Sequence, residues 1–164
     1  MDRLEKLWRG VRGNEWHPPD RMLVLDPGDT TGWSLFVGGI RGDSGQIVSS
    51  LDALTSLIDI IEPTLVVYER YVLYPWASEA QTFSDFPTVR LIGALELLCH
   101  QRGLATMSQT AQQAKGFVGD ERLKELHIYN TNQRHANDAT RHGVYALIAN
   151  KSLPEGTPPE EYTS

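Results

Sequence analysis

Three acidic residues that lie far apart in the sequence are each placed at the end or the beginning of a predicted core element. Asp26 and Glu69 each follow an apolar run that is typical of a buried strand, and Asp138 lies near the start of a predicted helix over residues 135–149. Carboxylate oxygens are the ligands that Mg²⁺ and Mn²⁺ prefer in proteins. Because two such ions can activate a water and stabilise the leaving oxygen of a phosphodiester, the chain is a candidate phosphodiester-cleaving enzyme.

Each acidic residue also has an ordinary structural interpretation. Asp26 precedes a Pro-Gly pair and suits a turn. Glu69 could face solvent or pair with the adjacent Arg70, and Asp138 suits the first turn of a helix, where the macrodipole favours negative charge. The metal-site hypothesis rests on the three acidic residues taken together. If the strands that end in Asp26 and Glu69 are parallel neighbours, both carboxylates lie at the edge where open α/β sheets place their sites.

Two histidines share a helix face with the third acidic residue. His135, Asp138 and His142 follow the spacing i, i+3, i+7, which returns to one side of a helix. A histidine beside carboxylates can bind a metal ion, position a water or donate a proton. For His142, a polar residue partly buried between helix and sheet is an equally good explanation. Arg141 lies one step off this face, where it could meet a phosphate or solvent.

Apolar runs and turn residues predict the elements that must position these residues. The predicted strands cover residues 22–25, 31–37, 40–48, 64–69 and 104–107. The predicted helices cover residues 51–61, 86–101 and 135–149, and residues 111–126 contain another helix. The first three strands follow one another as an antiparallel meander, and helices separate the later strands. We therefore expect an α/β fold with a mixed five-stranded sheet, a three-strand antiparallel meander plus parallel strands, flanked by helices.

The length and composition suit one domain with two peripheral segments. The chain has 164 residues, of which 40% are hydrophobic and 22% are charged, as expected for a globular protein with a proper core. Residues 1–20 are interpreted as an N-terminal extension with one short helix, and residues 152–164 as a flexible acidic tail. No apolar run is long enough to span a bilayer, and no secretory signal is visible, so we expect a cytoplasmic protein without a membrane partner.

The net charge of −6 opposes nucleic-acid binding, because counterion release needs a basic surface. Two considerations weaken this objection. Bound divalent cations would offset several of the carboxylates, and the acidic tail can lie away from a DNA surface. The lone Cys99 cannot form an internal disulfide and is expected to be a buried thiol in a reducing compartment.

Four short motifs resemble, in this order, those of the RuvC family of Holliday junction resolvases, and above all its shorter bacteriophage members. They are Leu23-Val-Leu-Asp26-Pro-Gly, Thr31-Gly32, Val66-Val-Tyr-Glu69 and His135-x-x-Asp138-Ala. The resemblance spans residues 22–150. It implies a ribonuclease H-like nuclease domain over residues 21–151 and a homodimer. It also implies Mg²⁺-dependent paired nicking of four-way DNA junctions in recombination or phage DNA processing, in a bacterial cell or a phage-infected host.

The resemblance also assigns roles to individual residues. Asp26, Glu69 and Asp138 would be catalytic metal ligands, and His135 would take the fourth position, with two Mg²⁺ ions per site and Mn²⁺ as a substitute. The predicted DNA-binding residues are Lys115, Lys124, Arg70, Tyr71 and Tyr74. The family aromatic residue that follows the glutamate by three falls on Val72, so Tyr71 or Tyr74 would have to replace it.

Several alternatives remain open from the sequence. A nuclease for flaps, other branched DNA or RNA–DNA hybrids would use the same metal chemistry, and an inactive junction-binding protein is the non-enzyme alternative. The Asp-Pro-Gly-Asp-Thr-Thr-Gly segment from Asp26 also resembles the first phosphate loop of sugar kinases and actin-like ATPases, but those proteins close two such domains around ATP. For the homodimer, the apolar stripe of the helix over residues 86–101, with Trp76 and Phe83 nearby, is the candidate interface, unless this stripe packs on the sheet.

Overall fold

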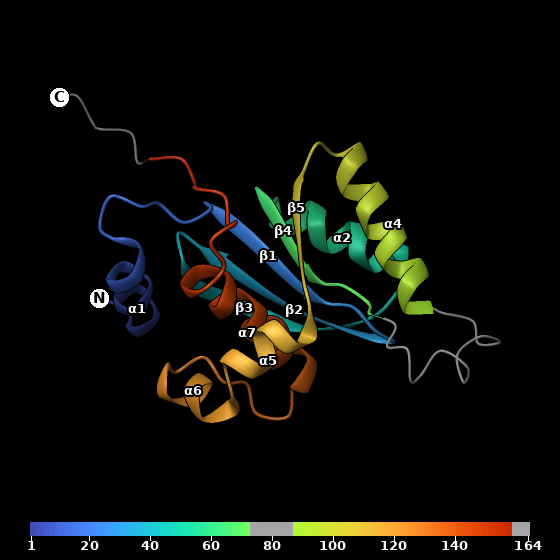
Figure 1. The fold of residues 1–164 in the computed structure, drawn as a ribbon. Coiled ribbons are helices and arrows are strands. Elements are labelled where there is room, and N and C mark those ends of the chain that lie inside the picture. Colours follow the sequence, from blue (N-terminus) through green and yellow to red (C-terminus); the bar gives the residue numbers. More distant parts are fainter. Residues whose placement is uncertain (73–86, 159–164) are drawn as a thin grey trace.

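A five-stranded mixed sheet forms the centre of the molecule (Figure 1). The computed structural model describes residues 1–72 and 87–158. The strand order in the sheet is β3-β2-β1-β4-β5. The strands are β1 (Arg21–Asp26), β2 (Thr30–Val37), β3 (Ile40–Val48), β4 (Leu65–Glu69) and β5 (Ala105–Gln109).

The pairing of the strands brings two of the predicted carboxylates to one edge of the sheet. β1, β2 and β3 form the expected antiparallel meander, whereas β4 pairs in parallel with both β1 and β5. In the β1–β4 register, Leu25 lies opposite Tyr68. Asp26 and Glu69, the next residues along the chain, therefore end neighbouring parallel strands. This confirms the predicted mixed sheet.

Helices cover both faces of the sheet (Figure 1). They are α1 (Arg3–Arg12), α2 (Leu51–Ile61), α4 (Pro87–Gln101), α5 (Ala111–Phe117), α6 (Asp120–Glu125) and α7 (Arg134–Ile148). Side chains alternate between two core clusters along β1: Met22 and Val24 face the cluster with α1, α6 and α7, and Leu23 and Leu25 face the one with α2 and α4. The alternation explains why β1 is apolar throughout, because both of its faces are buried.

One helix is expected within residues 111–126, and the structure has two short helices there. Val118 has an extended backbone between α5 and α6, and its side chain is buried in the core. Its carbonyl accepts a hydrogen bond from Arg141 Nε at 3.1 Å. The break therefore lets the Val118 side chain reach the core and its carbonyl meet Arg141 of α7.

The N-terminal helix is part of the core on the α7 side of the sheet. Leu4 and Trp8 are buried, and Trp8 Nε1 donates to the carbonyl of Gly39 at 3.1 Å. Arg12 donates to three carbonyls at the end of α7, those of Ala146, Leu147 and Asn150, at 2.7–2.8 Å. The N-terminal segment therefore braces the helix that carries Asp138, while the division of the chain into domain and extension stays a prediction.

Residues 152–158 of the expected tail pack against the body. Leu153 is buried in the core, and Gly156 N donates to His17 O at 2.9 Å. A Cβ added at Gly156 would lie 2.0 Å from the carbonyl oxygen of Pro18, so the two segments touch closely. The rest of the expected tail, residues 159–164, lies outside the described residues.

The apolar stripe of α4 packs within the chain rather than forming a surface. Leu95 and Leu98 are buried, and Leu91 packs against the same core cluster, which also contains α2. The expectation that this stripe forms a dimer interface is therefore wrong, because the sheet and α2 already cover it. Tyr74, Trp76 and Phe83, the other aromatic residues considered, lie outside the described residues.

Two smaller expectations concern the thiol and the membrane. Cys99 is fully buried, as predicted. Among residues 1–72 and 87–158, no helix is both long enough and apolar enough to cross a bilayer.

Candidate metal centre

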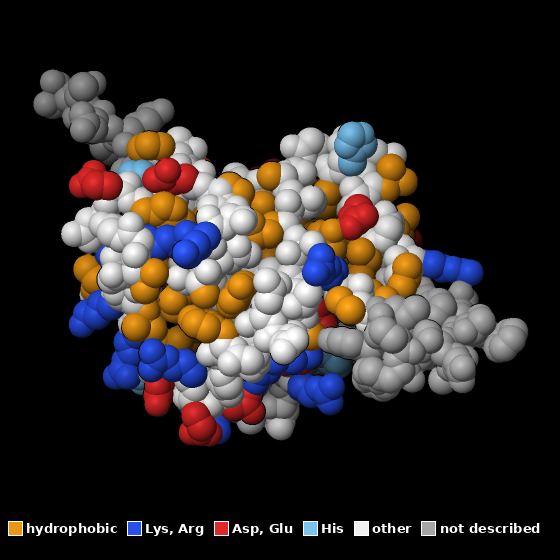
Figure 2. Space-filling model, viewed as in Figure 1, with side chains coloured by type: hydrophobic (Ala, Val, Ile, Leu, Met, Phe, Trp, Pro, Cys, Tyr) orange, Lys and Arg blue, Asp and Glu red, His pale blue; other side chains and the backbone are white. Residues whose placement is uncertain are grey.

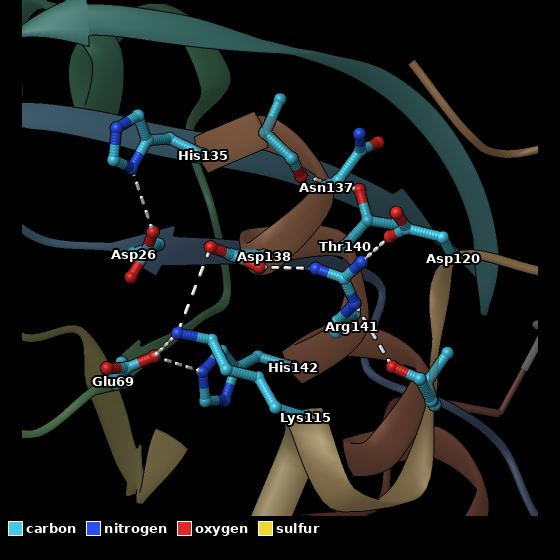
Figure 3. A network of polar contacts seen from close by, with 12 residues as sticks. Asp26, Glu69, Lys115, Asp120, His135, Asn137, Asp138, Thr140, Arg141 and His142 are labelled. Carbon is cyan, nitrogen blue, oxygen red and sulfur yellow. Dashed lines mark hydrogen bonds and ion pairs between the residues drawn. The ribbon is translucent and has the colours of Figure 1, made fainter. Parts of the chain in front are cut away.

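Asp26, His135 and Asp138 converge beyond the ends of β1 and β4 (Figure 3). Each offers a ligand atom, and these atoms all lie within 4.8 Å of one another. His135 Nδ1 lies 3.3 Å from Asp26 Oδ2. The two aspartates are buried, at 8% and 5% exposure, whereas His135 is half-buried, so the cluster is open on the histidine side.

Glu69 lies next to this cluster and is joined to it by a lysine. Lys115 Nζ is 3.9 Å from Glu69 Oε2 and 3.8 Å from Asp138 Oδ2. In Figure 3 the amine of Lys115 points between the two carboxylates. All three predicted acidic residues, His135 and Lys115 are therefore brought together from four different elements.

Two glycines allow α7 to approach the sheet closely enough for this arrangement. Gly32, opposite Asp26 in the β1–β2 register, faces the first turn of α7. A Cβ added there would lie 1.8 Å from the carbonyl oxygen of His135. Farther along α7, a Cβ on Gly143 would lie 2.1 Å from the ring of Phe36. The Thr-Gly motif in β2 is thus explained by helix packing, since any side chain at Gly32 would displace the backbone of His135.

Hydrogen bonds to the sheet fix the rotation of α7. His135 N donates to Gln46 Oε1 at 3.0 Å, and Thr140 Oγ1 donates to Ser34 Oγ at 3.0 Å. These contacts come from β3 and β2, respectively. The helix that carries two of the candidate ligands is therefore tied to the antiparallel half of the sheet, while Asp26 and Glu69 come from its parallel strands.

The carboxylates repel one another in a partly buried environment. Burial and, after it, the negative charges of Glu69 and Asp138 together raise the pKa of Asp26 to about 6, against the lowering effect of the hydrogen bond with His135. Burial also favours the protonated form of Glu69. The hydrogen bond from His142 and the charge of Lys115 help to outweigh burial, so the pKa of Glu69 lies below its ordinary value. A bound cation would relieve this repulsion.

The donor set suits a hard divalent cation. Asp26 and Asp138 offer carboxylate oxygens, the kind of ligand that Mg²⁺ and Mn²⁺ prefer. His135 adds one imidazole nitrogen, and Glu69 adds a further carboxylate beside them. These residues therefore fit the predicted metal chemistry.

His142 is a buried partner of Glu69 between α7 and the sheet, as its structural interpretation requires, and a part in the chemistry stays a prediction. It is 0% exposed, with Nε2 at 2.8 Å from Glu69 Oε2 and Nδ1 at 2.9 Å from Gln109 Oε1. Within the described residues, the buried Gln109 Nε2 has no hydrogen-bond partner. If the amide is rotated by half a turn, Nε2 donates to His142 Nδ1, and a neutral His142 can donate from Nε2 to Glu69.

Arg141 also belongs to the centre and is not left to solvent. Its guanidinium contacts the carboxylates of Asp138 and Asp120. Together with the bond to Val118 O, these contacts hold Arg141 at the junction of α6 and α7. The i, i+3 spacing of Asp138 and Arg141 was a signal for their pairing. The sequence carried no comparable signal for Gln109, because its partner lies on α7.

Of the other predicted DNA-binding residues, Arg70, Tyr71 and Lys124 belong to the described part of the chain, and Tyr74 lies outside it. Arg70 directly follows Glu69 and is exposed, as is Tyr71. Lys124 on α6 pairs with Glu121 at 2.9 Å and lies over the ring of Tyr129, 5.1 Å from its centroid. On the visible face in Figure 2, Lys and Arg side chains gather over α5 and α6 with acidic side chains among them.

The fold has known structural relatives, although no family model and no curated protein matches the sequence. The fold is the ribonuclease H-like one found in RuvC. Thermus thermophilus RuvC in complex with a Holliday junction substrate has a TM-score of 0.62 and 13% identity, over 84% of this chain and 99% of that chain. A further T. thermophilus RuvC structure has a TM-score of 0.58 and 14% identity, with the same coverage. The yeast mitochondrial Holliday junction resolvase Ydc2 has a TM-score of 0.50 and 11% identity, over 90% and 86%.

Proposed function

We propose that this chain is a RuvC-like Holliday junction resolvase: a metal-dependent endonuclease that makes paired nicks in four-way DNA junctions as a homodimer. The observation that carries the proposal is the convergence of Asp26, His135 and Asp138 within 4.8 Å in this fold. Among the structural neighbours, RuvC is in complex with a Holliday junction substrate, and Ydc2 is a Holliday junction resolvase by name. The expected setting is recombination or phage DNA processing in the cytoplasm of a bacterial cell or phage-infected host.

Asp26, His135 and Asp138 would hold Mg²⁺ or Mn²⁺, with Glu69 as a further ligand and two ions in the complete site. When bound, these ions supply Lewis acidity toward the phosphodiester and lower the pKa of a bound water. Lys115 is half exposed between Glu69 and Asp138, so it can bind a phosphate oxygen of the scissile strand.

The remaining residues of the centre keep the ligands in place. Arg141 holds one oxygen of Asp138, while the other oxygen faces Lys115. His142 donates to Glu69 from a buried position, which restricts the rotamer of that carboxylate. Because a misplacement of about 1 Å can cost about 10²-fold in rate, these contacts bear directly on cleavage.

The deciding experiment compares DNA substrates of matched sequence. Labelled four-way junction, flap, duplex and RNA–DNA hybrid are incubated with the protein in Mg²⁺, Mn²⁺ or EDTA. We expect metal-dependent, symmetrically paired cuts in the junction, no cleavage in EDTA, and a dimer by light scattering, as two related cuts require two-fold symmetry. Preferred single cuts in flap or hybrid by a monomer would instead favour the alternative nucleases.

Variants of the candidate ligands test the site separately from the substrate. Asp26→Asn, Glu69→Gln and Asp138→Asn should each abolish cleavage while junction binding persists, because each removes charge needed at the transition state. Junction binding without cleavage by the wild-type protein, in every metal tried, would favour an inactive junction-binding protein. Near wild-type turnover by any one variant would remove that residue from the site.

A further inference from the structure

A polar pocket of about 640 Å³ opens beside the candidate metal centre. It shares Asp138 and Lys115 with that centre, and Tyr129 and the loop residues before α7 complete its wall. Its volume lies within the range of roughly 300–1,000 Å³ that small-ligand pockets have. The pocket is therefore a distinct space next to the reacting groups, large enough for one nucleotide.

The framework of the pocket is fixed by hydrogen bonds across the fold. The buried side chain of Asn137 accepts from Asn130 N at 2.8 Å and donates to Asn130 O at 2.9 Å. Asn130 in turn donates to Ser44 on β3 at 2.7 Å. Arg141 joins the opposite wall to α6 through its contact with Asp120. A pocket built in this way needs little ordering when a ligand binds, which favours affinity.

The rim offers polar groups that the fold itself does not use. Asn132, Gln133 and Arg134 are exposed, and their side chains form no hydrogen bond or ion pair with the described part of the chain. Amide side chains suit the edges of bases, and a guanidinium suits a phosphate. The half-buried ring of Tyr129 packs against the core below them. Lys124 Nζ lies over this ring, 5.1 Å from its centroid, so a base that stacks on Tyr129 takes the place of that exposed, flexible side chain.

We propose that this pocket receives one unstacked nucleotide of the bound DNA, adjacent to the scissile phosphate, with its base against Tyr129 and its phosphate facing Arg134. The inference rests on the proposed function, because the metal centre beside Asp138 would place the scissile phosphate at the pocket entrance. A nucleotide at a branch point is cheaper to unstack than one inside a duplex. The pocket would therefore help to select branched DNA and to set the position of the cut.

The test uses the full chain with Asp26→Asn to prevent cleavage, and measures junction binding by fluorescence anisotropy. One abasic nucleotide is moved through the positions that flank the cut. Tyr129→Ala should weaken binding by about tenfold to hundredfold, the loss found for one base stacked on an aromatic ring. Tyr129→Phe keeps the ring and should bind within about twofold of the parent, as should Lys6→Ala, an exposed cation on α1.

The abasic scan provides the specific readout. At one flanking position the abasic site should weaken binding by the parent protein but cause no further loss with Tyr129→Ala, because both changes remove the same contact. Arg134→Ala should weaken binding to every junction by a similar factor and reduce the salt dependence.

Three results would overturn the inference. If the loss of binding affinity caused by Tyr129→Ala multiplies with the loss caused by the abasic nucleotide at every position, no base occupies the pocket. Cleavage of junctions by the wild-type protein would in that case still support the proposed function. If Tyr129→Ala fails to fold, as judged by thermal unfolding, a flat abasic profile with the parent protein is the overturning result. Absence of both junction binding and cleavage by the wild-type chain would reject the proposed function together with the pocket.

Discussion

Gly32→Ala should change the positions of the candidate metal ligands without altering any of the ligands themselves. The added Cβ would start 1.8 Å from the carbonyl oxygen of His135, whereas real Cβ contacts do not fall below 3.0 Å. The first turn of α7 must therefore move away from β2 by about 1.2 Å, because the obstacle is backbone on both sides. This movement carries His135 and Asp138 away from Asp26, although no ligand is altered.

The expected losses follow from this displacement. A misplacement of about 1 Å can cost about 10²-fold in rate, so junction cleavage by Gly32→Ala should fall by about that factor or more. Overpacking of a core contact costs about 1–3 kcal/mol, so the free energy of unfolding should fall by a similar amount. Cleavage assays at saturating Mn²⁺ measure the rate, Mn²⁺ titration by calorimetry measures the metal affinity, and urea unfolding measures the free energy of unfolding.

Gly10→Ala is the matched control for this substitution. Gly10 lies on α1 with nothing within 4 Å of an added Cβ, so alanine should leave cleavage unchanged and stabilise the helix by about 0.5–1 kcal/mol. If Gly32→Ala kept wild-type stability, metal affinity and cleavage, α7 would not be seated on β2 as described, and the geometric account of the site would fail.

Three further predictions address the contacts around the centre. His142→Ala should lower kcat by about 10-fold to 10²-fold with little change in junction affinity, because it frees the Glu69 carboxylate, which only the metal-dependent step uses. His142→Gln can still donate to Glu69 and should recover part of the rate, so equal rates for the two variants would exclude a positioning role. Metal affinity should be fully present above the raised Asp26 pKa of about 6 and weaken by up to about tenfold per pH unit below it, since a metal ligand must be deprotonated. Calorimetry at several pH values measures this affinity, and an affinity independent of pH would contradict the prediction. Arg12→Ala should lower the free energy of unfolding by about 1–3 kcal/mol, because it removes charged hydrogen bonds to the end of α7, whereas the exposed Lys6→Ala should change it by less than about 0.5 kcal/mol in urea unfolding.

The sequence by itself determined the strands and the acidic residues that end them. The apolar run before Asp26 and the one before Glu69 needed only local pattern to be identified as buried strands. If the two strands are parallel neighbours in one sheet, their last residues lie at the same edge. The structure has this parallel pairing, between β1 and β4. Helical periodicity in the same way placed His135, Asp138 and His142 on one face, because the spacing along a helix is fixed.

Only the tertiary structure decided which partner each side chain meets. The apolar stripe of α4 could suit a dimer interface or a core equally well, since a periodic pattern gives the face of a helix but not what covers it. Gln109 and His142 are 33 residues apart, and Arg12 and Leu147 are 135 apart, so no local spacing could relate them. The break at Val118 likewise depends on a contact with α7. The candidate ligands can thus be identified from local sequence patterns, whereas the contacts that orient these side chains arise from packing between distant segments.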